Sequence, residues 1–459
     1  MIRIFLVAAL LGWLAGRPAW AEPPADTATA VATATTAPTA LTSASAEIPA
    51  LVPTPSAAPV VTSATAAPTA TVTTTAIAPA SQTQSSQTQS RPRTLDHDES
   101  LLATTFSALR EGKLDEAQRD IDTLLHAQPD FRLAQLIRGD LLLAHAQALD
   151  HIGNTRQDSP ALEDLRAEAR ARLESVLQPP PAGMVPEQVL LLADSIRHIV
   201  VVDTEKSRLY LFANRNGMPV YLADFYVTIG RNGSGKSHEG DERTPLGIYR
   251  ITSRLHDSAL LATYGPLAFP LDFPNDWDKH KGSSGHGIWL HGTFSGTYSR
   301  PPHASDGCVV LTNTDLDSLA NFIAPDNTPV LITDHIRWVT PDTVLAERQQ
   351  LMQHVSQWQQ DWQSLNVERY LGNYSKDFTA DQTGFADWAA RKRQIAPGKR
   401  WIKVELSNLS LFEYPGQSGL FLADFRQDYQ SNNLVNNMHK RQYWTQQSGE
   451  WKILAEDSL

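Results

Sequence analysis

The segment from Leu101 to about Leu177 carries apolar residues at helical spacing. Leu102, Phe106 and Leu109 follow one another at intervals of four and three positions. Side chains at these intervals lie on the same face of a helix, so the pattern predicts successive amphipathic helices that each bury one face. We assign residues 98–193 to a helical domain.

One stretch of this region, ALREGKLDEAQRDIDTLLHAQPDFRLAQLIRGDLLLA, resembles a tetratricopeptide-type helical hairpin. Gly112 stands at the expected turn, and Pro129 precedes the next helix. The resemblance covers about one repeat, and fewer than three such repeats rarely form a stable unit alone. Two interpretations therefore stay open for this domain: packing or dimerisation, and peptide recognition.

After a proline-rich break at Gln178 to Gly183, the pattern changes to short apolar runs that are separated by glycine and proline. Runs of this length and composition are typical of strands. The expected strands are His198 to Asp203, Arg208 to Ala213, Val220 to Ile229 and Pro329 to Thr333. We therefore expect a mostly-β domain over residues 197–334.

The C-terminal part begins with a helix-like pattern from His335 to about Gln363, of which residues 335–350 form a connecting helix. Strands are expected at Trp401 to Leu411, Leu420 to Ser431, Arg441 to Thr445 and Trp451 to Glu456. Helices before a run of long antiparallel strands predict an α+β domain over residues 351–459. Its many aromatic residues either fill the core or line a ligand pocket.

The first residues have the pattern of a secretory signal peptide. Arg3 precedes an apolar run, Ile4 to Leu14, and an A-x-A cleavage site ends at Ala21. The run is shorter than the roughly 20 apolar residues that a membrane span requires. We predict a cleaved signal peptide at residues 1–21 and an exported, periplasmic protein; without cleavage, the same segment would tether the protein to the inner membrane.

The next residues, 22–97, consist mainly of Ala, Thr, Pro, Ser and Gln, with few charged residues before about residue 90. A chain of this composition cannot bury enough apolar surface to offset the entropy that ordering costs. We expect a disordered arm. A glycosylated or wall-spanning spacer has the same composition and stays open as an alternative.

Two classes of partner are disfavoured. The chain has a net charge of −11 and a pI near 5.7. Its sequence shows no basic patch of the kind that a nucleic-acid-binding protein presents. Residues Gly230 to Ser237 fit the phosphate-loop expression G-x-x-x-x-G-K-[ST]. A helix must follow such a loop to face the phosphates, but Gly240, Pro245 and Gly247 interrupt it. We therefore expect neither nucleic acid nor a nucleotide as a partner.

The single cysteine, Cys308, is the main candidate for chemistry. It cannot form an internal disulfide, so it is either a small buried hydrophobe or a reactive thiol. Nucleophilic catalysis requires a thiolate, an oriented base and N–H donors for the oxyanion. We interpret Cys308 as the thiolate nucleophile and His291 as its base, which the Gly292 carbonyl holds in one tautomer. The N–H groups of Gly307 and Cys308 are the oxyanion donors, and Ser305 braces the turn.

Simpler interpretations of these residues exist. Cys308 alone fits a buried position at the start of the strand CVVL, and His291 alone fits a core histidine. A zinc site would use His280, His286, His291 and His303. Their spacing matches no metal-site template, and no H-E-x-x-H motif is present, so we expect no metal.

The His-Gly pair at His291 and the run SDGCV around Cys308 together resemble the signature of the L,D-transpeptidase (YkuD-type) catalytic domain, a His-Gly followed by [S/T]-x-G-C. Upstream, GDERTPLGIY is similar to the family's segment G-D-x-x-T-P-x-G-x-[YF]. The stretch from Tyr264 through AFPLDFPNDWD resembles the family's substrate-side loop. The resemblance spans Arg197 to Asp334 and implies a YkuD-type β-sandwich.

The chain departs from the family pattern at two positions. Asp306 stands where many members have His, which leaves His291 as the only base that the motif supplies. Val310 stands where many members have Arg, which removes a charge near the substrate. The candidate substrate-binding residues are therefore Tyr264, Lys279, Lys281, Arg300 and Asp306.

Both departures resemble the branch of cell-shape-determining L,D-carboxypeptidases, which carries a C-terminal nuclear-transport-factor-like α+β domain similar to Trp358 through Glu456. The resemblance implies that Cys308 attacks the L,D peptide bond before the terminal D-Ala of a peptidoglycan tetrapeptide stem. D-Ala leaves and a thioester forms, without a metal or an organic cofactor.

L,D-transpeptidase chemistry is favoured. The alternatives are an L,D-carboxypeptidase that trims tetrapeptide to tripeptide, and a non-catalytic wall-binding module; a homodimer through the helical or the C-terminal domain is compatible with each.

Overall fold

The computed structural model describes residues 97–458, with gaps at 148, 150, 155–158, 257–259 and 381–382. The expected signal peptide at residues 1–21 and nearly all of the expected arm at residues 22–97 lie outside the described residues. No helix in the described part is long and apolar enough to cross a membrane.

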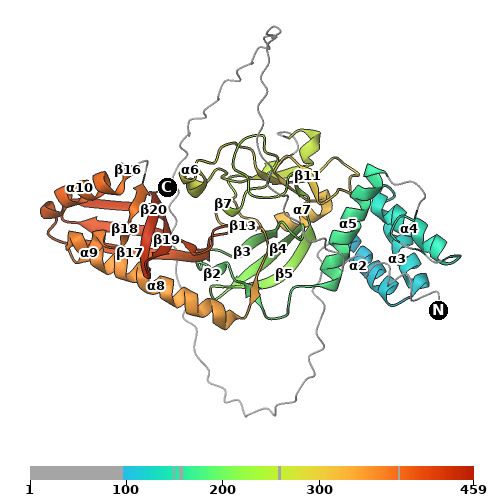
Figure 1. The fold of residues 1–459 in the computed structure, drawn as a ribbon, viewed down its shortest axis with the longest axis horizontal. Coiled ribbons are helices and arrows are strands. Elements are labelled where there is room, and N and C mark those ends of the chain that lie inside the picture. Colours follow the sequence, from blue (N-terminus) through green and yellow to red (C-terminus); the bar gives the residue numbers. More distant parts are fainter. Residues whose placement is uncertain are drawn as a thin grey trace, which may run out of the picture. The chain divides into compact units, whose positions relative to one another are not determined.

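The N-terminal part of the described chain is helical, as expected (Figure 1). Its helices are α2 (His97–Arg110), α3 (Leu114–Ala127), α4 (Arg132–Ala144) and α5 (Pro160–Leu177). Gly112 turns the chain between α2 and α3 with a φ of 72°, a conformation that glycine adopts without a steric penalty. The apolar stripe that the spacing predicted is buried: Leu102, Phe106 and Leu109 belong to one core with residues of α3, α4 and α5.

The middle of the chain forms a β-sandwich, which confirms the mostly-β expectation. One sheet has the strand order β5-β4-β3-β13-β7, and the other has the order β12-β10-β9-β8. A shared core joins Val200 and Leu209 of the first sheet to Phe269, Leu290 and Val309 of the second. Strands β3 and β13 begin and end at the residues that the apolar runs predicted.

The bounds in this domain are β3 (His198–Asp203), β4 (Arg208–Arg215), β5 (Met218–Tyr226), β6 (Ile229–Gly230), β7 (Gly247–Arg250), β8 (Leu255–His256), β9 (Leu267–Pro270), α6 (Asp276–His280), β10 (Trp289–His291), β11 (His303–Ser305), β12 (Val309–Val310), α7 (Asn313–Ala320) and β13 (Pro329–Thr333). Short strands alternate here with long connections. The connections carry most of the candidate site residues.

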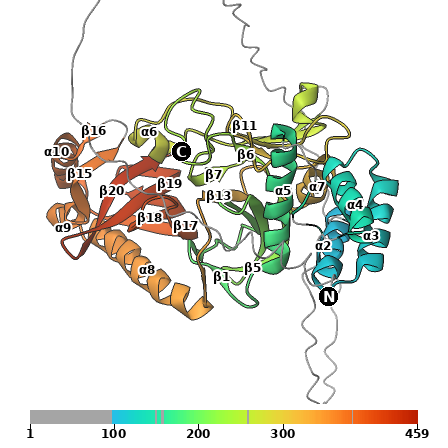
Figure 2. The ribbon, with the colours of Figure 1, turned by 45° about the vertical axis from the view of Figure 1, so that its right-hand side comes forward.

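The C-terminal part combines helices with a curved, mostly antiparallel sheet in which one pair of strands is parallel (Figure 2). Its elements are α8 (Pro341–Gln363), α9 (Val367–Leu371), β15 (Tyr374–Ala380), β16 (Thr383–Gly384), α10 (Phe385–Ile395), β17 (Ile402–Glu413), β18 (Leu420–Ser431), β19 (Leu434–Gln447) and β20 (Glu450–Ser458). Many of its aromatic residues, including Trp358, Phe425 and Trp444, are buried in one core. The α+β expectation is thereby confirmed.

Two boundary predictions are wrong. The range assigned to the helical domain ends in strands β1 (Val185–Pro186) and β2 (Val189–Leu191), and β2 pairs with β17 of the C-terminal sheet. The prolines after α5 stop the helix, and the following apolar residues are buried on both faces as a strand. The helix expected from His335 begins only at Pro341, because β14 (Trp338–Val339) pairs with β1. Proline is well suited to the first position of a helix and disfavours helical geometry in the residue before it.

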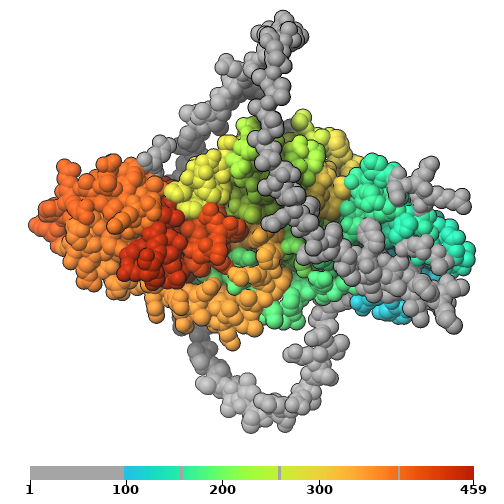
Figure 3. Space-filling model, in the orientation of Figure 1, coloured from blue at the N-terminus to red at the C-terminus, as the bar shows by residue number. Residues whose placement is uncertain are grey.

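The β-sandwich and the C-terminal domain share a buried apolar cluster. The atoms of the two parts also adjoin at the surface (Figure 3). Asn275 Nδ2 donates to the Tyr414 hydroxyl at 3.0 Å, and the ring of Trp277 stacks on Tyr443 with 4.9 Å between centroids. Ile248 and Phe412 belong to the same apolar cluster. The C-terminal domain is therefore packed against the β-sandwich rather than tethered to it.

Candidate active site

Strand pairing brings Cys308 and His291 together. Strands β10 and β12 are parallel, with Leu290 opposite Val309 and His291 opposite Val310. Leu290 and Val309 are fully buried in the sandwich core. Cys308 directly precedes β12 and lies outside the paired residues. Alternation along an extended chain puts its side chain on the face opposite Val309, which is also the face of His291.

His291 is held as a neutral base. Its Nδ1 lies 2.7 Å from the carbonyl oxygen of Gly292. A carbonyl only accepts, so Nδ1 carries the hydrogen and Nε2 keeps a free lone pair. Burial lowers the pKa of His291 to about 4, since the charged imidazolium loses its hydration. The ring of Tyr264 packs edge-on against the imidazole, with 4.9 Å between centroids.

Burial disfavours the thiolate that the sequence interpretation expects at Cys308. Burial raises the pKa of the Cys308 thiol to about 11, although a backbone hydrogen bond from Trp289 favours the anion. The thiol donates to the Gly287 carbonyl at 3.3 Å. The described contacts of Cys308 include no hydrogen bond to His291. Burial therefore favours the neutral form of both Cys308 and His291.

At two glycines of the motif, neighbouring atoms lie too close to leave room for a side chain. A Cβ on Gly292 would lie 2.2 Å from Oδ1 of Asn313. Gly307 has a φ of 125°, and a Cβ there would lie 2.7 Å from the carbonyl oxygen of Arg243. Real Cβ atoms do not approach other atoms so closely, so a side chain at either position would displace the segment that carries His291 or Cys308.

Asn313, which the sequence interpretation missed, anchors the segment after His291. Its Oδ1 accepts from the Thr293 N–H at 2.8 Å, and its Nδ2 donates to the Thr293 carbonyl at 3.0 Å. It is the first residue of α7 and belongs to no part of the sequence motif. Only the tertiary contact reveals its role.

The predicted oxyanion donors are only partly available. The Gly307 N–H donates to Ser305 Oγ at 3.2 Å, so it is already engaged. Ser305 in turn donates to the Cys308 carbonyl at 2.6 Å, which fits its predicted role as a brace of the turn. The Cys308 N–H is left as the candidate donor of the predicted pair. Thr244, another residue that the sequence interpretation missed, donates to the Gly307 carbonyl at 2.9 Å and fixes the turn from the other side.

The predicted substrate residues lie in different surroundings. Arg300 is partly buried, and its Nη2 donates to the Ala304 carbonyl at 3.1 Å. Its Nε is buried and has no hydrogen-bond partner among the described residues. Asp306 is exposed and pairs with Arg231 at 3.1 Å. Arg300 therefore lies by the catalytic residues, close enough for its charge to contribute to the lowered pKa of His291.

The two lysines that were predicted to bind the substrate lie on or next to α6. Lys279 is on α6, where it is mostly exposed and pairs with Asp276 at 3.4 Å. Lys281 follows α6 and pairs with Asp278 at 3.2 Å. Both are engaged with carboxylates of their own helix, unlike Arg300.

The phosphate-loop resemblance is not matched by a phosphate-loop structure. No helix follows residues 230–237, in keeping with the glycine and proline that interrupt the next segment. Lys236 is buried and pairs with Asp241 at 2.7 Å. Asp241 also accepts from the N–H groups of Ser237 and His238, at 2.8 and 3.1 Å. The lysine thus stabilises its own loop. Over the described residues, no group of three or more His, Cys, Asp or Glu side chains is arranged to hold a metal ion.

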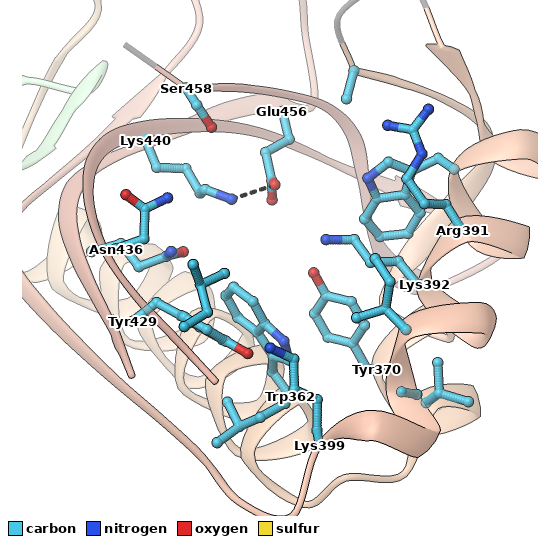
Figure 4. A pocket seen from close by; sticks show the side chains of 18 of the residues that line it. Trp362, Tyr370, Arg391, Lys392, Lys399, Tyr429, Asn436, Lys440, Glu456 and Ser458 are labelled. Carbon is cyan, nitrogen blue, oxygen red and sulfur yellow. Dashed lines mark hydrogen bonds and ion pairs between the residues drawn. The ribbon is translucent and has the colours of Figure 1, made fainter. Parts of the chain in front are cut away.

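A second concave site lies in the C-terminal domain (Figure 4). It is a pocket of about 360 Å³, and its lining includes Trp362, Tyr370, Trp388, Lys392, Lys399, Gln427, Tyr429, Lys440 and Glu456. Lys440 and Glu456 form an ion pair in it. Lys392 Nζ lies 5.0 Å from the centroid of the Trp388 ring, and the described residues give it no carboxylate or hydrogen-bond partner. Sequence reasoning named the aromatic residues but not these lysines.

Comparison with known proteins matches both domains separately. Residues 197–332 match the family of the L,D-transpeptidase catalytic domain, YkuD. Residues 350–457 match the family of the Cds6 C-terminal NTF2-like domain. A search of the curated proteins found no match.

Solved structures with the same fold include two bacterial proteins. Bd1075 of Bdellovibrio bacteriovorus has 28% identity and a TM-score of 0.53, over 60% of this chain and 98% of that chain. The helical cell shape determining protein Pgp2 of Campylobacter jejuni has 25% identity and a TM-score of 0.50, over 59% of this chain and 95% of that chain. The chain therefore carries a segment that matches the YkuD-type L,D-transpeptidase catalytic domain, followed by a segment that matches an NTF2-like domain.

Proposed function

We propose that the protein is an exported cysteine enzyme that acts on peptidoglycan stem peptides by L,D-transpeptidase-type acyl transfer. The observation that carries the proposal is the parallel pairing of β10 with β12. The pairing runs β12, which begins directly after Cys308, beside the strand that ends in His291, and the Gly292 carbonyl leaves Nε2 of His291 free. A neutral thiol beside a neutral imidazole is a nucleophile with its general base.

In the first half-reaction, Nε2 of His291 takes the thiol proton as the sulfur attacks the carbonyl carbon before the terminal D-Ala. The carbonyl electron pair moves to oxygen, and the Cys308 N–H stabilises the resulting oxyanion. When the tetrahedral intermediate collapses, the C–N bond breaks, and His291 returns its proton to the leaving amine of D-Ala. The product is a thioester on Cys308.

In the second half-reaction, an acceptor attacks the thioester carbonyl and His291 takes the acceptor's proton. The C–S bond breaks, and the proton returns to the sulfur. An amine from a neighbouring stem gives a crosslink, which is the transpeptidase outcome that we favour. Water gives a tripeptide, the outcome of an L,D-carboxypeptidase; the likeness to a cell shape determining protein supports this alternative.

The test is incubation of the purified protein with defined tetrapeptide muropeptides, followed by mass spectrometry. Crosslinked dimers with release of D-Ala are the expected result. Tripeptide alone would replace transpeptidase by carboxypeptidase. No change with the wild-type protein, together with no acylation of Cys308 by a carbapenem, would favour the non-catalytic wall-binding module.

A second function, binding of the cell wall, is supported by the pocket in the C-terminal domain. Gln427 lines this pocket and is 1% exposed, and neither atom of its side-chain amide has a hydrogen-bond partner among the described residues. Buried amides are normally hydrogen-bonded, so an unpaired one at a pocket wall fits a ligand. Lysines among aromatic rings suit the carboxylates and sugar faces of peptidoglycan.

A further inference from the structure

The segment between β10 and β11 connects the helical domain to the candidate active site. It runs from Gly292 to Pro302 and joins the strand of His291 to the turn that contains Cys308. Two residues of its middle part, Tyr298 and Ser299, are hydrogen-bonded to helices α5 and α4 of the helical domain. We refer to residues 292–302 as the site loop.

Ser299 of the site loop caps helix α4. The N-cap residue of α4 is Phe131, whose side chain makes no capping hydrogen bond. The Leu133 N–H instead donates to Ser299 Oγ at 2.9 Å, across 166 positions of sequence. The first N–H groups of a helix have no partner within it, and a hydroxyl oxygen satisfies one of them. Helix α5 has its own cap, since Ser159 accepts from the Leu162 N–H at 3.2 Å.

Arg172 of α5 forms a second anchor. It is 2% exposed, and its Nη2 donates to the Tyr298 carbonyl at 3.4 Å. The Arg172 guanidinium lies 4.1 Å from the centroid of the Tyr226 ring and pairs with Glu168 at 3.0 Å. The ring of Tyr298 contacts Phe131, with 5.9 Å between centroids. The helical domain therefore holds consecutive residues of the site loop from one side.

The β-sandwich holds the next residues of the same loop. The Tyr226 hydroxyl donates to the Arg300 carbonyl at 2.8 Å, and Thr228 Oγ1 donates to the Pro301 carbonyl at 2.9 Å. Arg300 thus follows directly after the residue that caps α4. Among the described residues, Arg300 forms no ion pair and its Nε has no hydrogen-bond partner, while its Nη2 donates to the Ala304 carbonyl. The guanidinium thus keeps donors for a ligand.

We propose that the helical domain is a positioning element of the active site: by accepting the N-terminal hydrogen bond of α4, Ser299 fixes the site loop and so orients Arg300 toward a carboxylate of the stem peptide. A guanidinium binds a carboxylate through hydrogen bonds with strict geometry, so a loose loop would weaken binding more than it slows the chemistry. The inference rests on the function proposed above.

The test compares Ser299→Ala with Ser159→Ala in the full-length protein. Each change removes a serine that caps one helix of the helical domain, but only Ser299 belongs to the site loop. For Ser299→Ala we expect faster hydrogen–deuterium exchange in residues 292–302 and an increase of KM of about fivefold, the factor that corresponds to one lost cap, with a smaller change in kcat. Ser299→Thr, which keeps a hydroxyl, should restore both. Ser159→Ala should lower thermal stability without changing either.

Equal exchange and equal KM in the two alanine variants would overturn the proposal. A lower kcat with unchanged KM for Ser299→Ala would also contradict it, because the loop would then act on the chemistry and not on substrate position. If the wild-type protein shows no turnover, the proposed function fails, whereas the exchange comparison still decides whether the cap from Ser299 holds the loop.

Discussion

Two regions of this molecule, the surroundings of Cys308 and the C-terminal pocket, differ in how they are built. His291 is buried and Cys308 is partly buried, and desolvation favours the neutral form of both. In the C-terminal pocket, Lys392 stands among aromatic rings without a carboxylate partner in the described residues, and a second lysine pairs with Glu456. The first region depends on backbone geometry, and the second depends on charge and aromatic surface.

Under the proposed function, this difference separates the chemistry from the attachment to the wall. A catalytic pair needs its atoms at fixed positions, so the candidate site uses glycines, strand pairing and hydrogen-bonded turns. A binding pocket for a repetitive polymer needs only complementary groups, so lysines and aromatic rings suffice. Changes in the first region should therefore affect turnover, and changes in the second should affect attachment.

The largest expected effect is the loss of the nucleophile or the base. Cys308→Ser and His291→Ala should each lower kcat on soluble muropeptides by at least about 10³-fold, because each removes a partner of the covalent step. Circular dichroism and thermal unfolding should show a folded protein. Retained turnover in either variant would remove that residue from the mechanism. Binding to isolated cell wall should stay as in the wild type.

The next effect concerns backbone geometry. Gly292→Ala should lower the free energy of unfolding by about 2–4 kcal/mol and reduce turnover, because the new Cβ meets Asn313 at 2.2 Å. Gly139→Ala in α4 is the matched control: nothing lies within 4 Å of its Cβ, so the change should stabilise the helix by about 0.5–1 kcal/mol. Chemical denaturation measures both. A Gly292→Ala protein as stable as the wild type would show that the site tolerates a displaced strand end.

A smaller effect is expected in the C-terminal pocket. Lys392→Met keeps an apolar stem but removes the charge, and should weaken co-sedimentation with isolated cell wall about tenfold, a typical value for one charge-assisted contact. Turnover of soluble muropeptides should not change. Arg393→Met is the control, since Arg393 lies on the same helix but pairs with Glu368 at the surface. Equal binding by both variants would contradict a wall-binding role for the pocket.

The smallest effect is the response of kcat/KM to pH near neutrality. His291 acts as a base only when it is neutral, so activity is present above its pKa of about 4 and is lost as the pH falls through that value. The thiol stays protonated up to a pKa of about 11. Between pH 6 and pH 8 we therefore expect a change of less than about twofold. An acidic limb near pH 6 to 7 would instead indicate a thiolate–imidazolium pair.

Local patterns predicted the elements because strands and helices bury one face at a fixed period. The apolar runs at residues 198–203 and 329–333 coincide with β3 and β13. The pattern failed at residues 185–191. An apolar stretch of this kind is compatible with both a helix and a strand, and only the pairing with β14 and β17 shows that it forms strands. It also placed the start of α8 too early, because pairing of β14 with β1 overrode the helix-like sequence.

For the site, the sequence by itself determined which residues are present and where the chain needs glycine. The His-Gly pair and the S-D-G-C turn demand close backbone approaches that only glycine allows at Gly292 and Gly307. Tertiary structure alone decided the rest. It set the protonation of Cys308 through burial, engaged the Gly307 N–H with Ser305, and supplied the cap of α4 from Ser299. These properties depend on desolvation and on contacts between distant segments, and neither is encoded in any local stretch of the chain.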